Sequence, residues 1–339
     1  MNPLYGAVLA GGSGTRLRPL TLHRPKPLLP VAGETLLEHN LAKLAAVGAK
    51  SVAIVIPARD KAIPQALGRR WRGMELSYVE QRVPRGTGHA LSLLRDYLPG
   101  AFALCFADNV TPWELSVLVS LHRQRKAVAT LALFHAKEPR KHGIAEVKGA
   151  RIVRLIEKPS EPPTDLASAG MFVFEPVIFE ALAGLSEGAG GETHIADAVQ
   201  VLIDSGEKVT YSVLDTWRRN VNTGEDILES NRLLLTDTAK PVEQPWARNP
   251  VSIGSGCAIE PDATVGPHVS MGRDCRVGRL AVVQDSILLD GVSVGERCVV
   301  SGCMLGEGSQ VADGVVLRNV ILADSRVARR SRAGPLRPA

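Results

Sequence analysis

The sequence predicts an α/β protein: a doubly wound, mostly parallel, Rossmann-like sheet followed by a parallel β-helix. Two patterns predict this fold. In the first 134 residues, short uncharged runs rich in Val, Leu and Ile alternate with segments whose apolar residues recur at helical spacing. Beyond residue 250, small apolar residues recur every six positions with glycine beside them. The predicted parts are a first domain at 1–238, a linker at 239–250, a β-helix at 251–325 and a basic tail at 326–339.

The composition is that of a folded protein, and its modest positive charge fits phosphorylated substrates. Apolar residues make up 45% of the 339, charged residues 22%, and the formal charge is +5. The start, Met1 to Pro3, lacks the basic region of a signal peptide, and no apolar run reaches membrane-spanning length, so we expect a cytoplasmic protein without a membrane partner. We interpret the arginines near the C-terminus as a solvated tail and expect no nucleic-acid partner.

The elements of the first domain follow in order. An uncharged strand, Tyr5 to Leu9, opens it, and a helix is predicted from Leu36 to Val47, before Gly48. Further strands are predicted at 51–56, 76–79, 101–107 and 128–134, and a further helix at 114–126. Ligands of doubly wound sheets bind at the carboxyl ends of the strands. Four candidates fall at such ends: Gly11, Gln81, Gly86 and Asp108.

A glycine-rich loop follows the first strand. It reads Ala10-Gly-Gly-Ser-Gly-Thr-Arg16, and its three glycines let backbone N–H groups approach a phosphate chain. Ser13 and Thr15 add hydroxyl donors. The loop is neither a Walker A motif nor the G-x-G-x-x-G dinucleotide fingerprint, because both spacings are absent. It therefore predicts a phosphate site of another kind.

Three cations lie close to this loop in the chain. They are Arg16, Arg18 and Lys26, and the lysine stands between two prolines, Pro25 and Pro27. The prolines stiffen the backbone on both sides of Lys26. Such a set suits a substrate with high negative charge.

The stretches GGSGTRLRPLT and PKPLLP resemble the signature of the sugar-1-phosphate nucleotidyltransferases, which make nucleoside-diphosphate sugars. The resemblance implies a transferase that joins a nucleoside triphosphate to a sugar 1-phosphate and releases pyrophosphate. It implies catalytic roles for Arg16 and Lys26, and a left-handed form of the β-helix. The nucleotide-binding residues that it implies at the loop are Leu9, Ala10, Gly11, Gly12, Ser13, Gly14 and Thr15.

Base recognition is expected at Gln81 and at the GTGHA stretch that contains Gly86 and Thr87. A glutamine amide can pair with a nucleobase edge. The stretch resembles that of relatives that use uracil or thymine, so we expect UTP or dTTP with glucose 1-phosphate or a related hexose 1-phosphate. The alternative is a mannose-1-phosphate guanylyltransferase.

The expected cofactor is Mg²⁺. Asp108 follows an apolar strand, where a carboxylate can hold Mg²⁺ against phosphate oxygens, and the resemblance makes it catalytic as well. The family's second metal ligand is an aspartate in W-x-D-x-G-T, but here the chain reads Trp217-Arg-Arg-Asn-Val-Asn-Thr-Gly224. Asn220 and Asn222 are both candidates for the second ligand.

The sugar side is expected at two further stretches. Glu157-Lys158-Pro resembles the family's EKP motif, in which Glu157 binds sugar hydroxyls and Lys158 neutralises the sugar phosphate. Gly143 begins the strand pair that the motif closes, and Gly170 lies in a strand that resembles the family's sugar-contacting strand.

The repeat begins after a linker that holds three prolines. Seven apolar residues follow one another at intervals of six, and the frame slips near Asp290. These residues are Ile253, Ile259, Val265, Met271, Val277, Val283 and Leu289. We expect four to five coils that pack against another subunit, which makes a homo-oligomer, and that take no part in the chemistry.

Two other functions fit the sequence less well. A non-catalytic nucleotide-sugar-sensing subunit should lack the lysine or the metal carboxylate, yet Lys26 and Asp108 are both present. A second, acyl-transferring activity of the β-helix would depend on His268, the sole histidine after the linker.

Overall fold

The computed structural model describes residues 3–12, 14–22, 24–185 and 191–328. The chain forms two compact units that do not follow chain order. The first consists of residues 1–13 and 36–218, and the second of 14–35 and 219–339. Residues 14–35, called the cation segment below, thus belong with the C-terminal part of the chain. The expected boundary at 238 stays a prediction.

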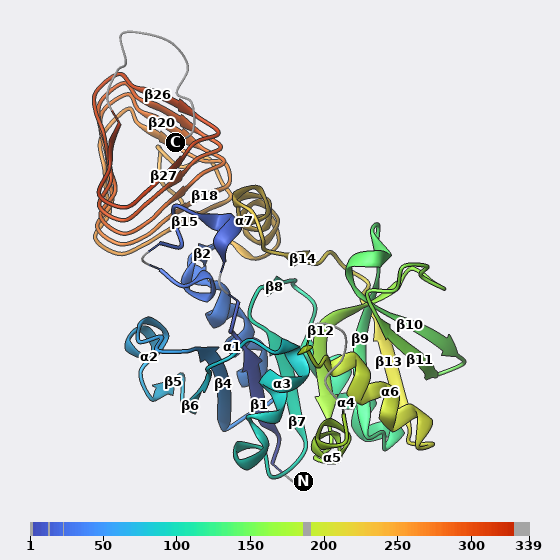
Figure 1. Ribbon diagram of the computed structural model, residues 1–339. Coiled ribbons are helices and arrows are strands. Elements are labelled where there is room, and N and C mark those ends of the chain that lie inside the picture. The colour runs from blue at the N-terminus through green and yellow to red at the C-terminus, as the bar shows by residue number, and fades with distance from the viewer. Residues whose placement is uncertain (1–2, 13, 23, 186–190, 329–339) are drawn as a thin grey trace. The chain divides into compact units, whose positions relative to one another are not determined.

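A ten-stranded mixed sheet forms the core of the first unit (Figure 1). Strands β6, β4, β1 and β7 are neighbours and run parallel, while β12 lies antiparallel between β7 and β9. In sheet order the strands are β10 (Gly143–Lys148), β11 (Arg151–Glu157), β13 (Val209–Val213), β9 (Ala129–His135), β12 (Leu166–Phe174), β7 (Phe102–Phe106), β1 (Tyr5–Leu9), β4 (Ser51–Pro57), β6 (Met74–Gln81) and β5 (Arg70–Trp71). The predicted fold class is confirmed.

Helices pack on this sheet and complete its core. They are α1 (Leu36–Ala46), α2 (Ala62–Leu67), α3 (Gly86–Ser92), α4 (Leu115–Arg125), α5 (Ile178–Ala183) and α6 (Ile195–Asp204). Short pieces are η3 (Arg95–Tyr97), η4 (Pro139–Lys141) and β8 (Asn109–Val110). Three aromatic rings join strands to α5: the Phe102 ring lies 5.7 Å from Phe174 and 5.5 Å from Phe179 between centroids. Across the described ranges, no helix is long and apolar enough to cross a membrane.

The second unit begins with the cation segment, which contains η1 (Thr15–Leu17), η2 (Lys26–Leu28) and the hairpin of β2 (Pro30–Val31) with β3 (Glu34–Thr35). After β14 (Arg219–Asn220), helix α7 (Gly224–Thr238) leads to stacked triangular coils (Figure 1). Their first face holds β15 (Val251–Ile253), β18 (Val269–Met271), β21 (Ile287–Leu288), β24 (Met304–Leu305) and β27 (Ile321–Leu322). The second holds β16 (Ala258–Ile259), β19 (Arg276–Val277), β22 (Ser293–Val294), β25 (Gln310–Val311) and β28 (Val327–Ala328). The third holds β17 (Thr264–Val265), β20 (Val282–Gln284), β23 (Val299–Ser301) and β26 (Val316–Arg318).

The coils shorten by one residue after the first turn. Val251 pairs with Val269, eighteen positions on, whereas Ile287 pairs with Met304, seventeen positions on. The lost residue comes from the corner that contains Asp285, where the backbone is left-handed with φ 46°. The sequence pattern placed this slip near Asp290, because the strand side chains that follow the corner show the shift first.

Candidate active site

The glycine loop starts at the carboxyl end of β1. Ala10 donates its N–H to the Val55 carbonyl at 2.8 Å, which holds the start of the loop against the neighbouring strand. Leu9 accepts from the Ala107 N–H at 3.0 Å on the other side. Gly12 faces open space, so its backbone is accessible to a ligand. Ser13 lies outside the described residues.

Both predicted catalytic cations of the loop region meet one asparagine. Asn222 Oδ1 accepts from Arg16 Nη2 at 3.0 Å and from Lys26 Nζ at 3.2 Å. Lys26 is only 5% exposed. Gly14 has φ 62°, and a Cβ there would come within 2.8 Å of the Lys26 Cβ, so this position needs glycine. Thr15 stands beside Arg16 in η1, with its side chain exposed.

The two candidate metal asparagines differ in their surroundings. The backbone N–H of Asn222 donates to Asp226 Oδ2 at 2.9 Å, within the capping box that Thr223 and Asp226 form at the start of α7. This capping box fixes the backbone position of Asn222, from which its side chain extends. The Asn220 Oδ1 atom is buried and has no hydrogen-bond partner among the described residues.

On the base side, Gln81 is held in one orientation. Its Nε2 donates to the Gly86 carbonyl at 3.2 Å and lies 2.9 Å from His89 Nδ1. A carbonyl only accepts, so the amide nitrogen must face this turn, and His89 must accept through an unprotonated Nδ1. Burial and then the charge of Arg85 lower the pKa of His89, which favours this neutral form. Gln81 Oε1 lies on the other side, 3.2 Å from where a Gly11 Cβ would be.

The glycines of the GTGHA turn are needed for packing within the protein. Gly86 has φ 87°, and a Cβ there would overlap the Thr193 carbonyl. Gly88 donates its N–H to that carbonyl at 2.8 Å, and the Thr87 hydroxyl accepts from the Ile195 N–H at 3.2 Å at the start of α6. The proximity of Thr193 therefore accounts for these glycines. Any contact of Gly86 and Thr87 with a base stays a prediction.

A buried polar cluster follows β7. Asn109 is 2% exposed; its Nδ2 donates to the Ala169 carbonyl at 2.9 Å, and its Oδ1 accepts from Arg218 Nη2 at 2.5 Å. Burial lowers the pKa of Arg218 to about 10, and the charge of Asp108 opposes this shift. Gly170 has φ 71°, and a Cβ there would overlap the Asn109 amide. The cluster thus joins the predicted metal carboxylate to the predicted sugar strand.

Sequence reasoning did not identify Arg218. Its guanidinium donates to the Ala169 carbonyl at 3.1 Å and lies over the Phe134 ring at 4.5 Å. The available signal was an arginine directly after Trp217, in the stretch searched for a metal ligand. His89 was also missed, since nothing in GTGHA indicates that its ring faces Gln81.

The predicted sugar residues Gly143, Glu157 and Lys158 come together on paired strands. Gly143 pairs with Glu157, and a Cβ on the glycine would come within 3.1 Å of the Glu157 Oε2. Lys158 Nζ lies 3.3 Å from Glu157 Oε1 and is exposed. Burial, then the charge of Arg218, lowers the pKa of nearby His142. Arg218 and Lys158 both contribute to that shift, so this region carries positive potential, which suits a sugar phosphate.

The oxygen ligands present fit Mg²⁺. Within the described ranges, no group of three or more His, Cys, Asp or Glu side chains is placed to hold a metal. Mg²⁺ needs fewer protein ligands, because it keeps water and phosphate oxygens around it. The Asp108 carboxylate is a ligand of the right kind, and so is the amide oxygen of Asn220, which has no donor among the described residues.

The first unit holds a Rossmann-like sheet with a glycine loop. In the second unit, two cations converge on one amide, and a β-helix follows. Together these features define a class: enzymes that transfer nucleotidyl groups. Residues 5–236 match the family model described as nucleotidyl transferase, and 247–331 match the GMPPB C-terminal domain. The chain belongs to the nucleotidyl transferase family.

Several characterised relatives are similar over most of their length. A glucose-1-phosphate thymidylyltransferase of Streptomyces griseus is 33% identical over 90% of this chain and 92% of its own. A mannose-1-phosphate guanylyltransferase of Mycobacterium tuberculosis is 30% identical, over 86% and 82%. A structure titled as a putative glucose-1-phosphate thymidylyltransferase from Bacillus anthracis superposes with TM-score 0.63 at 26% identity, covering 68% of this chain and 94% of that one.

Proposed function

We propose that the protein joins a nucleoside triphosphate to a hexose 1-phosphate, with release of pyrophosphate. The observation that carries this proposal is the convergence of Arg16 and Lys26 on the Asn222 amide oxygen. Two cations that converge on one point are suited to bind a polyanion. The relatives named above act on sugar 1-phosphates, which supports the same reaction here.

In this reaction an oxygen of the sugar phosphate attacks the α-phosphorus of the triphosphate. The bond from the α-phosphorus to the bridging oxygen breaks, and pyrophosphate leaves with that electron pair. Positioning and charge stabilisation supply the catalysis, since no covalent enzyme intermediate is needed. Arg16 and Lys26 stabilise the triphosphate and the departing pyrophosphate. Lys158 and Arg218 hold the attacking phosphate, while Glu157 accepts from sugar hydroxyls.

The orientation of Gln81 supports a base with an N–H on its pairing edge. Because Nε2 is engaged by Gly86 and His89, the amide offers its oxygen, an acceptor. Uracil and thymine present a ring N–H to such an acceptor, and so does guanine, whereas adenine and cytosine present a lone pair at that atom. We propose UTP or dTTP, with GTP and mannose 1-phosphate as the second candidate, which the mycobacterial relative favours.

Mg²⁺ is the proposed cofactor, with Asp108 as one ligand. When bound, it would neutralise charge on the phosphates. Asn220 is the proposed second ligand, because its buried amide oxygen has no partner among the described residues. Asn222 is the alternative, although its amide oxygen already accepts from Arg16 and Lys26.

We also propose that the β-helix forms a homo-oligomer through its third face. Val282, Val299 and Val316 lie in register on neighbouring strands of that face, and Val316 is 57% exposed. An outward row of β-branched side chains is a surface that another β-face can cover. We further propose that the protein works in the cytoplasm, so cell fractionation should recover it there.

The reaction can be tested by measuring pyrophosphate release with UTP, dTTP, GTP and ATP against several hexose 1-phosphates. We expect turnover with at least one pyrimidine triphosphate, and we expect Lys26→Ala to lower kcat by about 10²–10³, the usual loss for one preorganised charge donor. Lys240→Ala, which removes an exposed lysine of the linker, is the matched control. Normal turnover of Lys26→Ala at saturating substrate would contradict the role of that lysine.

Metal dependence should follow the proposed ligands. We expect no turnover in excess chelator, and loss of most activity in Asp108→Asn. Asn220→Ala should raise the Mg²⁺ concentration for half-maximal activity by about tenfold, while Asn222→Ala should leave it within twofold. The reverse order would move the second ligand to Asn222, and full activity with chelator would exclude the metal.

His89 should control base preference. His89→Leu removes the acceptor for Gln81 Nε2, so kcat/KM for the preferred triphosphate should fall about tenfold, and that for ATP should change less. In the wild type, protonation of His89 should weaken triphosphate binding only below its ordinary pKa of about 6.5, because burial lowers that pKa. The variant should lack this part of the acid dependence. His135→Leu, at an exposed histidine, is the control, and an unchanged base preference in His89→Leu would refute the role.

The oligomer interface can be tested by light scattering at micromolar concentration. Val299→Lys should lower the measured mass, because it places a charge in the middle of the valine row. Val153→Lys, at an exposed valine of β11 in the other unit, should leave the mass unchanged. A monomeric wild-type protein would rule out the oligomer.

A further inference from the structure

The cation segment contacts the β-helix near the β2–β3 hairpin. Arg24 forms an ion pair with Glu307, and a Cβ on Gly33 would overlap the Ser252 hydroxyl, so hairpin and coil are in close contact. The exposed ion pair contributes little by itself, since such pairs are worth at most about 1 kcal/mol. A buried contact is therefore needed to fix the position of the segment.

That contact is made by Asn231, on helix α7. Its side chain is 1% exposed, and both of its polar atoms are used. Oδ1 accepts from the Ala32 N–H at 2.9 Å, in the hairpin, and from Ser270 Oγ at 2.6 Å, in the β-helix. Nδ2 donates to the His268 carbonyl at 3.0 Å, also in the β-helix. One amide therefore joins the cation segment, α7 and two residues of the coils.

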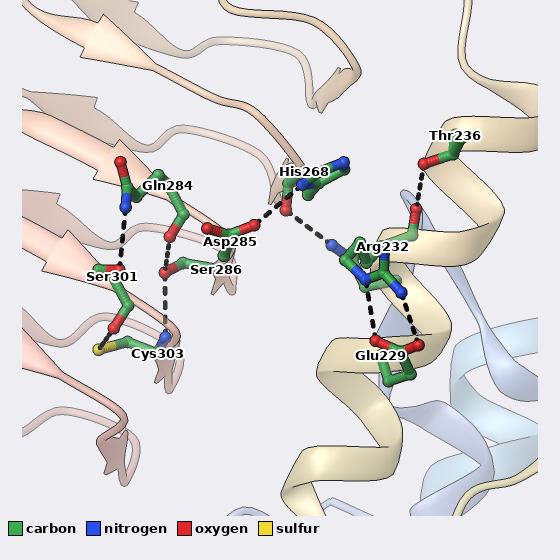
Figure 2. Close-up of polar contacts among 10 residues, drawn as sticks. Glu229, Arg232, Thr236, His268, Gln284, Asp285, Ser286, Ser301 and Cys303 are labelled. Carbon is green, nitrogen blue, oxygen red and sulfur yellow. Dashed lines mark hydrogen bonds and ion pairs between the residues drawn. The ribbon is translucent and has the colours of Figure 1, made fainter.

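The partners of Asn231 have unusual backbone conformations. Ala32 has φ 50° and Gly33 φ 89°, which are the values of the tight turn that joins two-residue hairpins. His268 has φ 58°, and its ring Nδ1 lies 2.9 Å from Asp285 Oδ1 (Figure 2). The His268–Asp285 contact holds the corner whose carbonyl Asn231 binds. Left-handed residues other than glycine are uncommon, so these positions are determined by their surroundings.

Helix α7 extends this connection to the cations. Asn222 directly precedes the Thr223 cap, and Asn231 lies nine positions further on, about 13 Å along a helix. Near the N-terminus of α7, a Cβ on Gly224 would overlap the Ile321 side chain of β27, so this end of the helix also touches the coils. Asn222, which accepts from Arg16 and Lys26, thus lies just before the helix, and Asn231, which binds the cation segment, lies further along it.

We propose that Asn231 is a positioning residue, through which the β-helix holds Arg16 and Lys26 in the arrangement that triphosphate binding requires. The kinetic consequence of this role rests on the proposed function, whereas the physical coupling between Asn231 and the cation segment does not. It gives the coils a part in the reaction, whereas the repeat pattern alone predicts only assembly. Loss of this tie should affect the triphosphate, which the two cations bind, more than the sugar phosphate.

The coupling is tested first without any assay of activity, by hydrogen exchange of the full-length protein. In Asn231→Ala we expect faster amide exchange in peptides that cover residues 24–35, with unchanged protection of the coils at 276–311. Asn249→Ala is the matched control, since that asparagine is exposed and bonds within the linker to Val242. Unchanged exchange at 24–35 would overturn the proposal.

Ser270→Ala provides a milder variant if Asn231→Ala unfolds the coils. It removes one donor to Asn231 Oδ1 and leaves the Ala32 contact in place, so exchange at 24–35 should rise by a smaller factor. An increase confined to the coils would overturn the proposal, because it would show a purely local role.

The kinetic test separates positioning from a loss of folded enzyme. Asn231→Ala should raise KM for the triphosphate about tenfold and leave KM for the sugar phosphate within twofold. In a Lys26→Ala background the same change should add less than twofold, because the two residues act on one feature. A lower kcat with both KM values unchanged would mean fewer active molecules and would refute the positioning role. If the wild type releases no pyrophosphate, the proposed function fails, while the exchange result still decides the coupling.

Discussion

The cationic part of the site depends on one neutral oxygen, that of the Asn222 amide. Because Arg16 and Lys26 both donate to it, at 3.0 and 3.2 Å, their nitrogens lie at most about 6 Å apart. The close packing of Gly14 against Lys26, the short helix η2 and the cap of α7 fix the positions of the two cations and of the asparagine. A polyanion can accept from two converging cations at once, so this arrangement favours such a ligand.

Much of the fold could be predicted from the sequence, because its signals are local. The strands β1, β4, β7 and β9 and helices α1 and α4 lie within a few residues of their predicted ranges, since each is one apolar run or one helical pattern. The six-residue period likewise predicts the coils. Helices α5 and α6 were not predicted, and neither was the antiparallel direction of β12. The grouping of residues 14–35 with 219–339 has no local signal at all, because its contacts join residues about two hundred positions apart.

Candidate site residues could be named where a short motif contains them, but not where only a contact in the folded chain indicates them. Glycine-loop residues, Lys26, Asp108 and the Glu157–Lys158 pair could all be named from short stretches, although their contacts with substrate stay predictions. Arg218 and His89 act through neighbours that only the folded chain supplies, Asn109 and Gln81. The turn at Gly86 shows the opposite case. The sequence indicated that this glycine leaves space for a base, and the structure shows that it also leaves space for Thr193.

The division of the chain into units bears on how the protein is made. Residues 14–35 are synthesised well before the residues that fix them, which are Asn222, Asn231 in α7, and Ser252 and Glu307 in the coils. Closing so long a loop is slow and entropically costly. The nascent chain must therefore carry an unanchored basic segment until α7 and the coils have been made. Chaperones that shield such a segment should raise the yield of folded protein more than they would for a chain whose units fold in order.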